Sequence, residues 1–159
     1  MIVDDNYLSA EGIEKNIDWE TLNAEIIHVC YNGTSAIEAM KKEPADLIIS
    51  DIEMPDLDGI SMSRQALEIN PMVKIILISA YDKFEYARRA LLLGALDYIE
   101  KPLDYAYLIQ KVKNAFALME KEQKNLQLLK QSRPLLTEKF FREIDRKSTR
   151  LNSSHSEIS

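Results

Sequence analysis

Residues 47–59 read Leu-Ile-Ile-Ser-Asp-Ile-Glu-Met-Pro-Asp-Leu-Asp-Gly, and this stretch decides the fold. It opens with a short apolar run, which is the pattern of a buried strand. Asp51 follows the run, and a polar loop then leads to Gly59, where a helical pattern begins. A strand that ends in a carboxylate and leads into a helix is the unit of a parallel sheet with a ligand site at its strand ends.

The same alternation of strand and helix extends along most of the chain. We expect strands at 2–3, 26–31, 47–50, 74–79 and 96–99. We expect helices at 9–17, 34–42, 59–70 and 83–93, and a long helix that Asp104 caps and that runs to about Gln131, before Pro134. The pattern predicts an α/β fold in which helices cover both faces of a doubly wound, five-stranded parallel sheet.

Composition limits the class of protein. The chain has 159 residues, of which 46% are hydrophobic and 29% are charged, and its net charge is −6. This balance is typical of a globular domain, and the negative charge argues against direct nucleic-acid binding. The apolar runs are too short to span a membrane. The single Cys30 cannot form an internal disulfide, so we expect a cytoplasmic protein.

Polar side chains follow four of the expected strands. Asp4 and Asp5 follow the first, Asp51 the third, Ser79 ends the fourth and Lys101 follows the fifth. Taken singly, each could be a helix cap, a turn residue or a surface charge. Because parallel strands end at one rim, the five should converge, and three carboxylates there suit Mg²⁺. An aspartate nucleophile, a cation and a lysine are what phosphoryl transfer to a carboxylate requires.

The motifs resemble the receiver domain of two-component response regulators. The resemblance covers residues 1–119 and rests on Val3-Asp4-Asp5, the 47–59 stretch, Ser79-Ala80 and Asp97-Tyr98-Ile99-Glu100-Lys101-Pro102. It implies the flavodoxin-like receiver fold, with strand order 2-1-3-4-5. It also implies a protein that takes a phosphoryl group from a histidine kinase and catalyses only its own phosphorylation and dephosphorylation.

The resemblance assigns a role to each motif residue. Asp51 would be the phosphoacceptor, and the expected Mg²⁺ ligands are Asp5, Asp4 acting mostly through water, Asp51 and the backbone carbonyl of Glu53. Lys101 would contact the phosphoryl group, Ser79 would be the switch hydroxyl and Tyr98 the switch aromatic. Tyr98 could instead be an ordinary half-buried strand residue. Pro102 is expected to follow a cis bond, and Gly59 is a structural residue.

Two features depart from the family pattern. Asn6 stands where many relatives have an acidic residue, which could alter metal affinity or dephosphorylation. The first strand has only two residues before Asp4, where about five are usual, so we expect a truncated strand and a marginally stable chain.

The last helix suggests a partner. Apolar residues recur along it at steps of four and three, interrupted by Glu122, in a heptad-like stripe: Leu108, Val112, Ala115, Met119, Leu126 and Leu129. Beyond residue 119 we expect a helical linker over 120–144 that forms a parallel homodimer, although the helix could also fold back. Together, 17–19, 79–87 and the Arg133-Pro134-Leu135-Leu136 segment resemble the subgroup that precedes an AraC-type DNA-binding domain. That output domain, for transcription regulation, is missing here.

Residues 145–159 differ from the rest of the chain. Ser, Thr and Asn replace the apolar periodicity, and the segment resembles a translated sequencing adapter. We expect a non-native tail; an ordinary flexible polar terminus is the alternative.

Three other functions are less consistent with the motifs. A haloacid-dehalogenase-type phosphatase would need Asp-x-Asp on the first strand, where this chain has Asp4-Asp5. A flavodoxin-like redox protein would need a phosphate-binding loop there, and an acidic pair would repel phosphate. A receiver that binds partners without phosphorylation would not need all five rim residues.

Overall fold

The structure is a computed structural model that describes residues 1–80 and 84–158, with side chains described up to 132 and over 139–146. The expected first residue of the fourth helix, Lys83, lies outside the described residues, as do Tyr81 and Asp82. So do the side chains of the Arg133-Pro134-Leu135-Leu136 segment and most of the expected tail. The chain divides into two compact units, Met1–Phe116 and Ala117–Ser159.

Unit 1 contains a five-stranded parallel sheet. Its strands are β1 (Ile2–Val3), β2 (Val29–Cys30), β3 (Leu47–Asp51), β4 (Lys74–Ser79) and β5 (Asp97–Glu100), in the order β2-β1-β3-β4-β5. The predicted α/β fold and its strand order are therefore confirmed.

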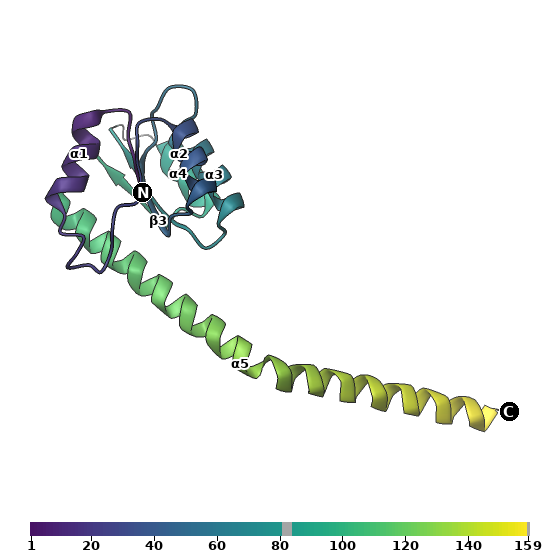
Figure 1. The fold of residues 1–159 in the computed structure, drawn as a ribbon. Helices are drawn as coiled ribbons and strands as arrows, with labels where there is room; N and C mark the ends of the chain where they lie inside the picture. Colours follow the sequence, from purple (N-terminus) through teal and green to yellow (C-terminus); the bar gives the residue numbers. More distant parts are fainter. Residues whose placement is uncertain (81–83, 159) are drawn as a thin grey trace. The chain divides into compact units, whose positions relative to one another are not determined.

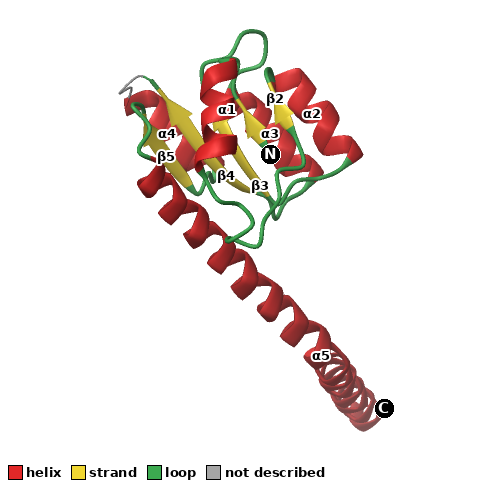
Figure 2. Cartoon of the chain, turned by 60° about the vertical axis from the view of Figure 1, so that its left-hand side comes forward, coloured by secondary structure: helices red, strands yellow, loops and turns green. Residues whose placement is uncertain are grey.

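Helices cover both faces of this sheet. They are α1 (Tyr7–Asn16), α2 (Gly33–Lys42), α3 (Gly59–Ile69), α4 (Phe84–Leu93) and α5 (Tyr105–Ile158). Figure 1 shows α1 and the first turns of α5 on one side of the strands and α2, α3 and α4 on the other. Figure 2 shows the strands side by side between these layers.

The core lies between the sheet and its helices. The residues of β3 and β4 are buried except for the partly exposed Lys74, as expected for central parallel strands. Ile48, Ile75 and Leu77 pack in one apolar cluster with Met40 of α2 and Met62 of α3. Burial of such side chains stabilises a fold by roughly 1.5–3 kcal/mol each, so the centre of the sheet is the rigid platform for the strand ends.

Asn and Asp side chains set where three helices begin. The Oδ1 of Asn6 accepts hydrogen bonds from the backbone N–H groups of Leu8 and Ser9. Asn32 caps α2 in the same way, and Asp58 caps α3. Such caps satisfy N–H groups that lack partners within the helix. Three residues separate α1 from β1 and two separate α2 from β2, so both helices begin close to the rim of the sheet.

Two expected elements have different bounds. The second strand covers only 29–30 of the expected 26–31, because β2 is an edge strand and β1 offers it only two residues to pair with. The last helix does not end at Gln131 but continues through Pro134 to Ile158. Proline removes one backbone hydrogen bond and its ring crowds the preceding turn, yet here the helix continues on both sides of it.

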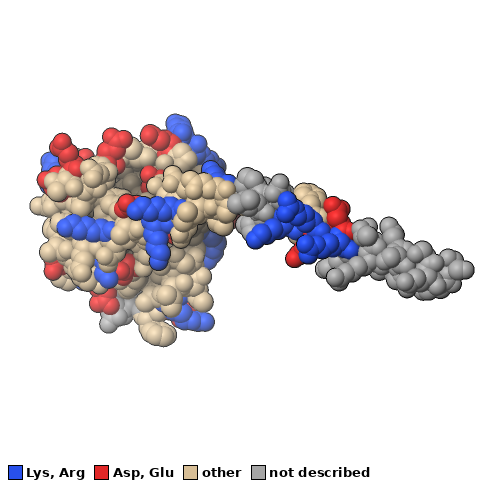
Figure 3. All heavy atoms as spheres, turned by 90° about the horizontal axis from the view of Figure 1, so that it is seen from below, with Lys and Arg blue, Asp and Glu red and all other residues tan. Residues whose placement is uncertain are grey.

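Charged side chains of both signs are interspersed over unit 1. Figure 3 shows Lys and Arg next to Asp and Glu on the face it draws, with no broad basic area among the described residues of that unit. Among the described residues, no helix is apolar over a length that would cross a membrane.

Candidate functional site: an acidic rim with one lysine

The register of the sheet brings the predicted rim residues together. Val3 pairs with Ser50, so Asp4 and Asp51 follow neighbouring strands at one level. Asp51 pairs with Ile78, and Ser79 pairs with Glu100, next to Lys101. The carboxyl ends of four parallel strands thus form one rim, where doubly wound sheets bind their ligands.

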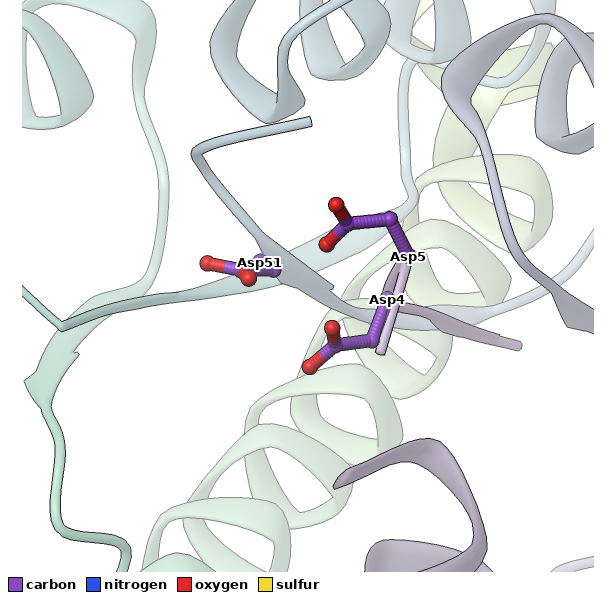
Figure 4. A group of neighbouring side chains, drawn as sticks. All are labelled: Asp4, Asp5 and Asp51. Atoms are coloured by element: carbon purple, nitrogen blue, oxygen red, sulfur yellow. The ribbon is translucent and has the colours of Figure 1, made fainter. Parts of the chain in front are cut away.

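Three carboxylates gather at this rim. Asp4, Asp5 and Asp51 each offer an oxygen that lies within 4.8 Å of the other two. Figure 4 shows them projecting from the ends of two neighbouring strands. Asp4 and Asp51 are buried, whereas Asp5 is exposed. The cluster therefore has two carboxylates fixed in the fold and one that faces solvent.

Lys101 bridges the two buried carboxylates. Its Nζ lies 3.4 Å from Oδ2 of Asp4 and 3.4 Å from Oδ2 of Asp51. The peptide bond between Lys101 and Pro102 is cis. A single ammonium shared by two carboxylates offsets part of the like-charge repulsion at the rim.

The ionisation of Asp51 reflects this surrounding. Burial is the main cause that raises the pKa of Asp51, and the negative charges of Asp4 and Asp5 raise it further, while Lys101 partly opposes them. Burial lowers the pKa of Lys101, but Asp51 and Asp4 outweigh burial and the pKa is raised. Lys101 is therefore a permanent cation at neutral pH, placed where negative charge would accumulate.

Backbone contacts hold the carboxylates in place. The N–H of Asn6 donates to Oδ1 of Asp4 over 2.9 Å, which ties Asp4 to the start of α1. Gly59 donates its N–H to the carbonyl of Ile52 over 2.8 Å. A Cβ at Gly59 would lie 2.1 Å from the carbonyl oxygen of Asp51, so only glycine fits there. The first turn of α3 can therefore pack directly against the end of β3.

Ser79, Tyr98 and Glu53 occupy the places that the sequence suggests. Ser79 is fully buried at the end of β4. Tyr98 is half-buried in β5 and packs against the core cluster. Glu53 is half-buried in the loop two residues after Asp51. The predicted rim residues thus lie at the ends of β1, β3, β4 and β5 or in the loops that follow these strands.

Sequence reasoning missed two features next to the rim. It named Asn6 only as a departure from the family, whereas the structure makes it the cap of α1 and the anchor of Asp4. The sequence analysis also did not identify the pair of aromatic residues that follow two strand ends, Tyr7 after β1 and Tyr31 after β2. Their rings lie 5.5 Å apart. Because the expected strand 26–31 includes Tyr31, a search just beyond the expected strand ends would have found only Tyr7.

The fold and the rim are those of a response-regulator receiver domain. Residues 1–113 match the response regulator receiver domain family, and the chain belongs to that family. It acts in two-component signalling as the receiver domain of a response regulator.

Relatives support the same family. The chain is 28% identical over 122 residues to the uncharacterized transcriptional regulatory protein YesN of Bacillus subtilis. The aligned residues make up 77% of this chain and 33% of YesN. The chain thus spans about a third of the length of that relative.

Three solved structures are similar to unit 1. The receiver domain of AraT, a response regulator from Geobacillus stearothermophilus, has a TM-score of 0.72 and 34% identity, covering 77% of this chain and 95% of that one. A two-component transcriptional regulator AraC from Clostridium phytofermentans has a TM-score of 0.69 and 31% identity, and the match covers 78% of this chain and 95% of that one. A CheX-CheY-BeF3-Mg complex from Borrelia burgdorferi has a TM-score of 0.63 and 30% identity, and the match covers 72% of this chain and 86% of that one.

Proposed function

We propose that this chain accepts a phosphoryl group on Asp51 from a histidine kinase, in a reaction that depends on Mg²⁺. The observation that carries the proposal is the clustering of three carboxylates around Lys101 at one rim of the sheet. A carboxylate nucleophile, a cation site and a fixed ammonium are the parts that phosphoryl transfer needs.

Asp51 is the member of the cluster best suited to be the acceptor. It ends a fully buried strand and is 8% exposed, so its carboxylate is fixed yet reachable from solvent. In the transfer, the P–N bond of a phosphohistidine breaks as a P–O bond to Asp51 forms. The electron pair of the P–N bond stays on the imidazole, which leaves as a neutral ring because its other nitrogen carries a proton. Lys101 lies where it can hydrogen-bond the transferred group.

The remaining carboxylates fit a hard divalent cation. All three ligands are oxygens, with no thiolate or imidazole in the cluster, which suits Mg²⁺. Asp5, Asp51 and the Glu53 carbonyl would hold it, with Asp4 acting through water. When bound, Mg²⁺ offsets the negative charge shared by the carboxylates and the phosphoryl oxygens. The similar CheX-CheY complex from Borrelia burgdorferi contains Mg²⁺ together with BeF3, which supports this role.

Ser79 and Tyr98 would carry the signal away from the rim. Ser79 ends β4 and Tyr98 lies on the neighbouring β5, paired with Leu77. In the proposed switch the Ser79 hydroxyl hydrogen-bonds the phosphoryl group and Tyr98 turns inward, which biases a two-state equilibrium. The surface formed by α4 and β5 would change as a result.

The proposed output is transcription control by a longer protein. The chain spans about a third of the length of YesN, and a similar solved structure is that of a two-component transcriptional regulator AraC from Clostridium phytofermentans. We propose that an AraC-type DNA-binding domain follows the receiver in the complete protein, and that residues 145–159 are a non-native tail. An independent genomic assembly of the gene tests the downstream domain and the non-native tail together. A reading frame that encodes residues 145–159 and then stops contradicts both proposals.

Acetyl phosphate with Mg²⁺ tests the main proposal. Intact mass should show one added phosphoryl group on the wild-type chain and none on Asp51→Ala. Asp97→Ala is the matched control, because Asp97 is a partly buried aspartate with its own lysine partner, Lys111 at 3.0 Å, outside the rim. Absence of added mass on folded wild type, or its persistence in Asp51→Ala, contradicts the proposal. Omission of Mg²⁺ should slow the labelling strongly.

We also propose that residues 120–144 pair with a second copy of the chain as a parallel coiled coil. Leu126 and Leu129 continue the heptad-like stripe and are 46% and 59% exposed in the single chain. Light scattering across a concentration series should show a dimer that Leu126→Ser with Leu129→Ser weakens. Lys124→Ala, a change at an exposed position outside the stripe, should leave the dimer intact. A concentration-independent monomer contradicts the pairing.

A further inference from the structure

A cavity opens between the loop that follows β3 and the helix α4. Its volume is about 420 Å³, within the range of roughly 300–1,000 Å³ that is common for small-molecule sites. We call it the α4 cavity, and its lining residues are Ile52, Glu53, Met54, Asp58, Tyr86 and Arg89. The cluster of Asp4, Asp5, Asp51 and Lys101 lies outside this lining, so the α4 cavity is a separate place in unit 1.

The buried wall of the α4 cavity is apolar and fixed. Ile52 and Met54 are 1% and 8% exposed and belong to the core cluster, against which the half-buried Tyr86 also packs. The N–H of Ile52 donates to the carbonyl of Ile78 over 2.9 Å, and its carbonyl accepts the N–H of Gly59 over 2.8 Å. A wall that β4 and α3 both hold in place can receive an apolar body without first being ordered.

Arg89 brings a guanidinium group to this wall. It is half-buried, and no hydrogen bond or ion pair joins it to another residue in the described part of the chain. Its neighbour Arg88 is exposed and pairs with Glu85 over 3.2 Å. Of two adjacent arginines of α4, one is thus paired within its own helix, whereas the other lines a cavity. A guanidinium in that position favours an anion, and its fork of N–H groups matches a carboxylate.

The two acids of the lining are engaged in contacts of their own. Oδ1 of Asp58 accepts the N–H of Ser61 over 2.8 Å, and Oδ2 accepts the Ser61 hydroxyl over 3.3 Å, at the start of α3. The amino-terminal end of a helix offsets a carboxylate placed there, so Asp58 acts as a cap. Glu53 also has an interaction within the chain. The charged group that remains for a ligand is therefore the guanidinium of Arg89.

We propose that the α4 cavity binds a small carboxylic acid with an apolar body. The carboxylate pairs with Arg89, and the apolar part lies against Ile52, Met54 and Tyr86. Such a ligand contacts the residue that follows Asp51 and gives the receiver a chemical input besides phosphorylation. Binding needs neither a phosphoryl group nor Mg²⁺, so the inference goes beyond the proposed function and its test does not depend on it.

Methionine methyl NMR on the full chain tests the α4 cavity. The chain has six methionines, and labelling with [methyl-¹³C]methionine gives one methyl signal for each. Met54 lines the cavity, whereas Met72 is 45% exposed outside it and serves as the reference. Met54→Leu and Met72→Leu assign the two signals. The chain is titrated with phenylacetate and hexanoate and, separately, with phenylacetamide and hexanamide, which have the same apolar bodies without the charge.

The proposal predicts binding that is selective for the acids and for Arg89. At least one of the two acids should shift the Met54 signal with saturation and leave the Met72 signal in place. Arg89→Gln should weaken this binding by roughly tenfold, the effect of losing a hydrogen-bonded charge pair, and the amide of the same acid should bind wild type with a similar loss. Arg88→Gln, one residue away, loses the pair with Glu85 and should bind like wild type.

Four results contradict the proposal. If neither acid gives a saturable shift of Met54, the cavity does not bind this class of ligand. Equal shifts of Met54 and Met72 mean contact with exposed surface in general. Equal affinity of an acid and its amide excludes recognition of the charge. Wild-type affinity in Arg89→Gln, or an equal loss in Arg88→Gln, with circular dichroism showing that both variants are folded, excludes Arg89 as the anchor.

Discussion

The two parts of α5 carry the same sequence pattern with opposite burial. In unit 1, Leu108, Val112 and Ala115 are fully buried against the rest of the receiver. In unit 2, Leu126 and Leu129 continue the same spacing but are largely exposed in the single chain. The comparison shows that a periodic apolar stripe predicts a helix, whereas burial depends on what is folded against it.

This difference separates the roles of the two units. Side chains of unit 1 have neighbours that make each deletion costly, because a buried cavity remains. Most of the described side chains of unit 2 beyond residue 122 are exposed, so their contribution depends on association. Changes in unit 1 should therefore alter the stability of the chain, and changes in unit 2 should alter its assembly.

The largest expected effect is a matched pair of leucine deletions. Leu108→Ala should lower the free energy of unfolding by roughly 2–5 kcal/mol, because it leaves a cavity in a close-packed core. Leu129→Ala should change it by less than about 0.5 kcal/mol in a monomer. Urea unfolding followed by fluorescence of Trp19, the single tryptophan, reports on unit 1.

Association must be kept out of that measurement. Unfolding at low protein concentration, repeated at tenfold higher concentration, separates assembly from intrinsic stability. Similar losses of unfolding free energy for both variants at low concentration would show that Leu129 is buried within its own chain. That result would contradict the difference in burial between the two parts of α5.

A second effect belongs to the first residue of unit 1. The amino-terminal ammonium of Met1 donates to the carbonyl of Leu47 over 2.8 Å, and burial lowers its pKa to about 6 from an ordinary 8.0. Between pH 6 and pH 8 the unfolded chain therefore binds more protons than the folded chain. Stability should rise with pH in this window, by about 2–3 kcal/mol for a shift of two units.

Acetylation of the amino terminus provides the control. It removes the charge and keeps an N–H that can donate to Leu47. The acetylated chain should be more stable at pH 6 and lose the dependence between pH 6 and pH 8, as read by urea midpoints. An unchanged pH profile after acetylation would assign the dependence to other groups.

A smaller effect is expected at the acceptor itself. Asp51→Asn removes a buried carboxylate whose pKa is raised, mainly by burial. An acid with a raised pKa destabilises the fold above its ordinary pKa, since the unfolded chain ionises more readily. The variant should therefore unfold at a higher temperature than wild type at pH 7 without Mg²⁺. Asp97→Asn, which loses the 3.0 Å pair with Lys111, should not be stabilised.

The smallest effect is expected on the surface of unit 2. The pair of Lys124 and Glu120 has an Nζ–Oε1 distance of 3.3 Å, and both side chains are exposed. Exposed ion pairs contribute little to stability. Lys124→Ala should therefore change the free energy of unfolding, obtained from the thermal transition in circular dichroism, by no more than about 0.5 kcal/mol. A large loss there would mean that another chain buries this pair.

The sequence predicted the receiver fold through features that act locally. The buried runs around Ile48 and Ile76 need apolar surfaces on both faces, and Gly59 follows the loop after Asp51 at a position where a side chain does not fit. The five rim residues could be predicted because parallel strands end on one side. The length of β2 could not, since it depends on how many residues of β1 are available to pair.

By itself the sequence determined the order of strands and helices and the residues that meet at the rim, because periodicity and strand direction are local properties. Only the tertiary structure decided that Lys101 lies between Asp4 and Asp51 and that Tyr7 and Tyr31 pair. Each of these contacts joins elements whose separation is fixed by packing. No pattern within a single element contains that distance.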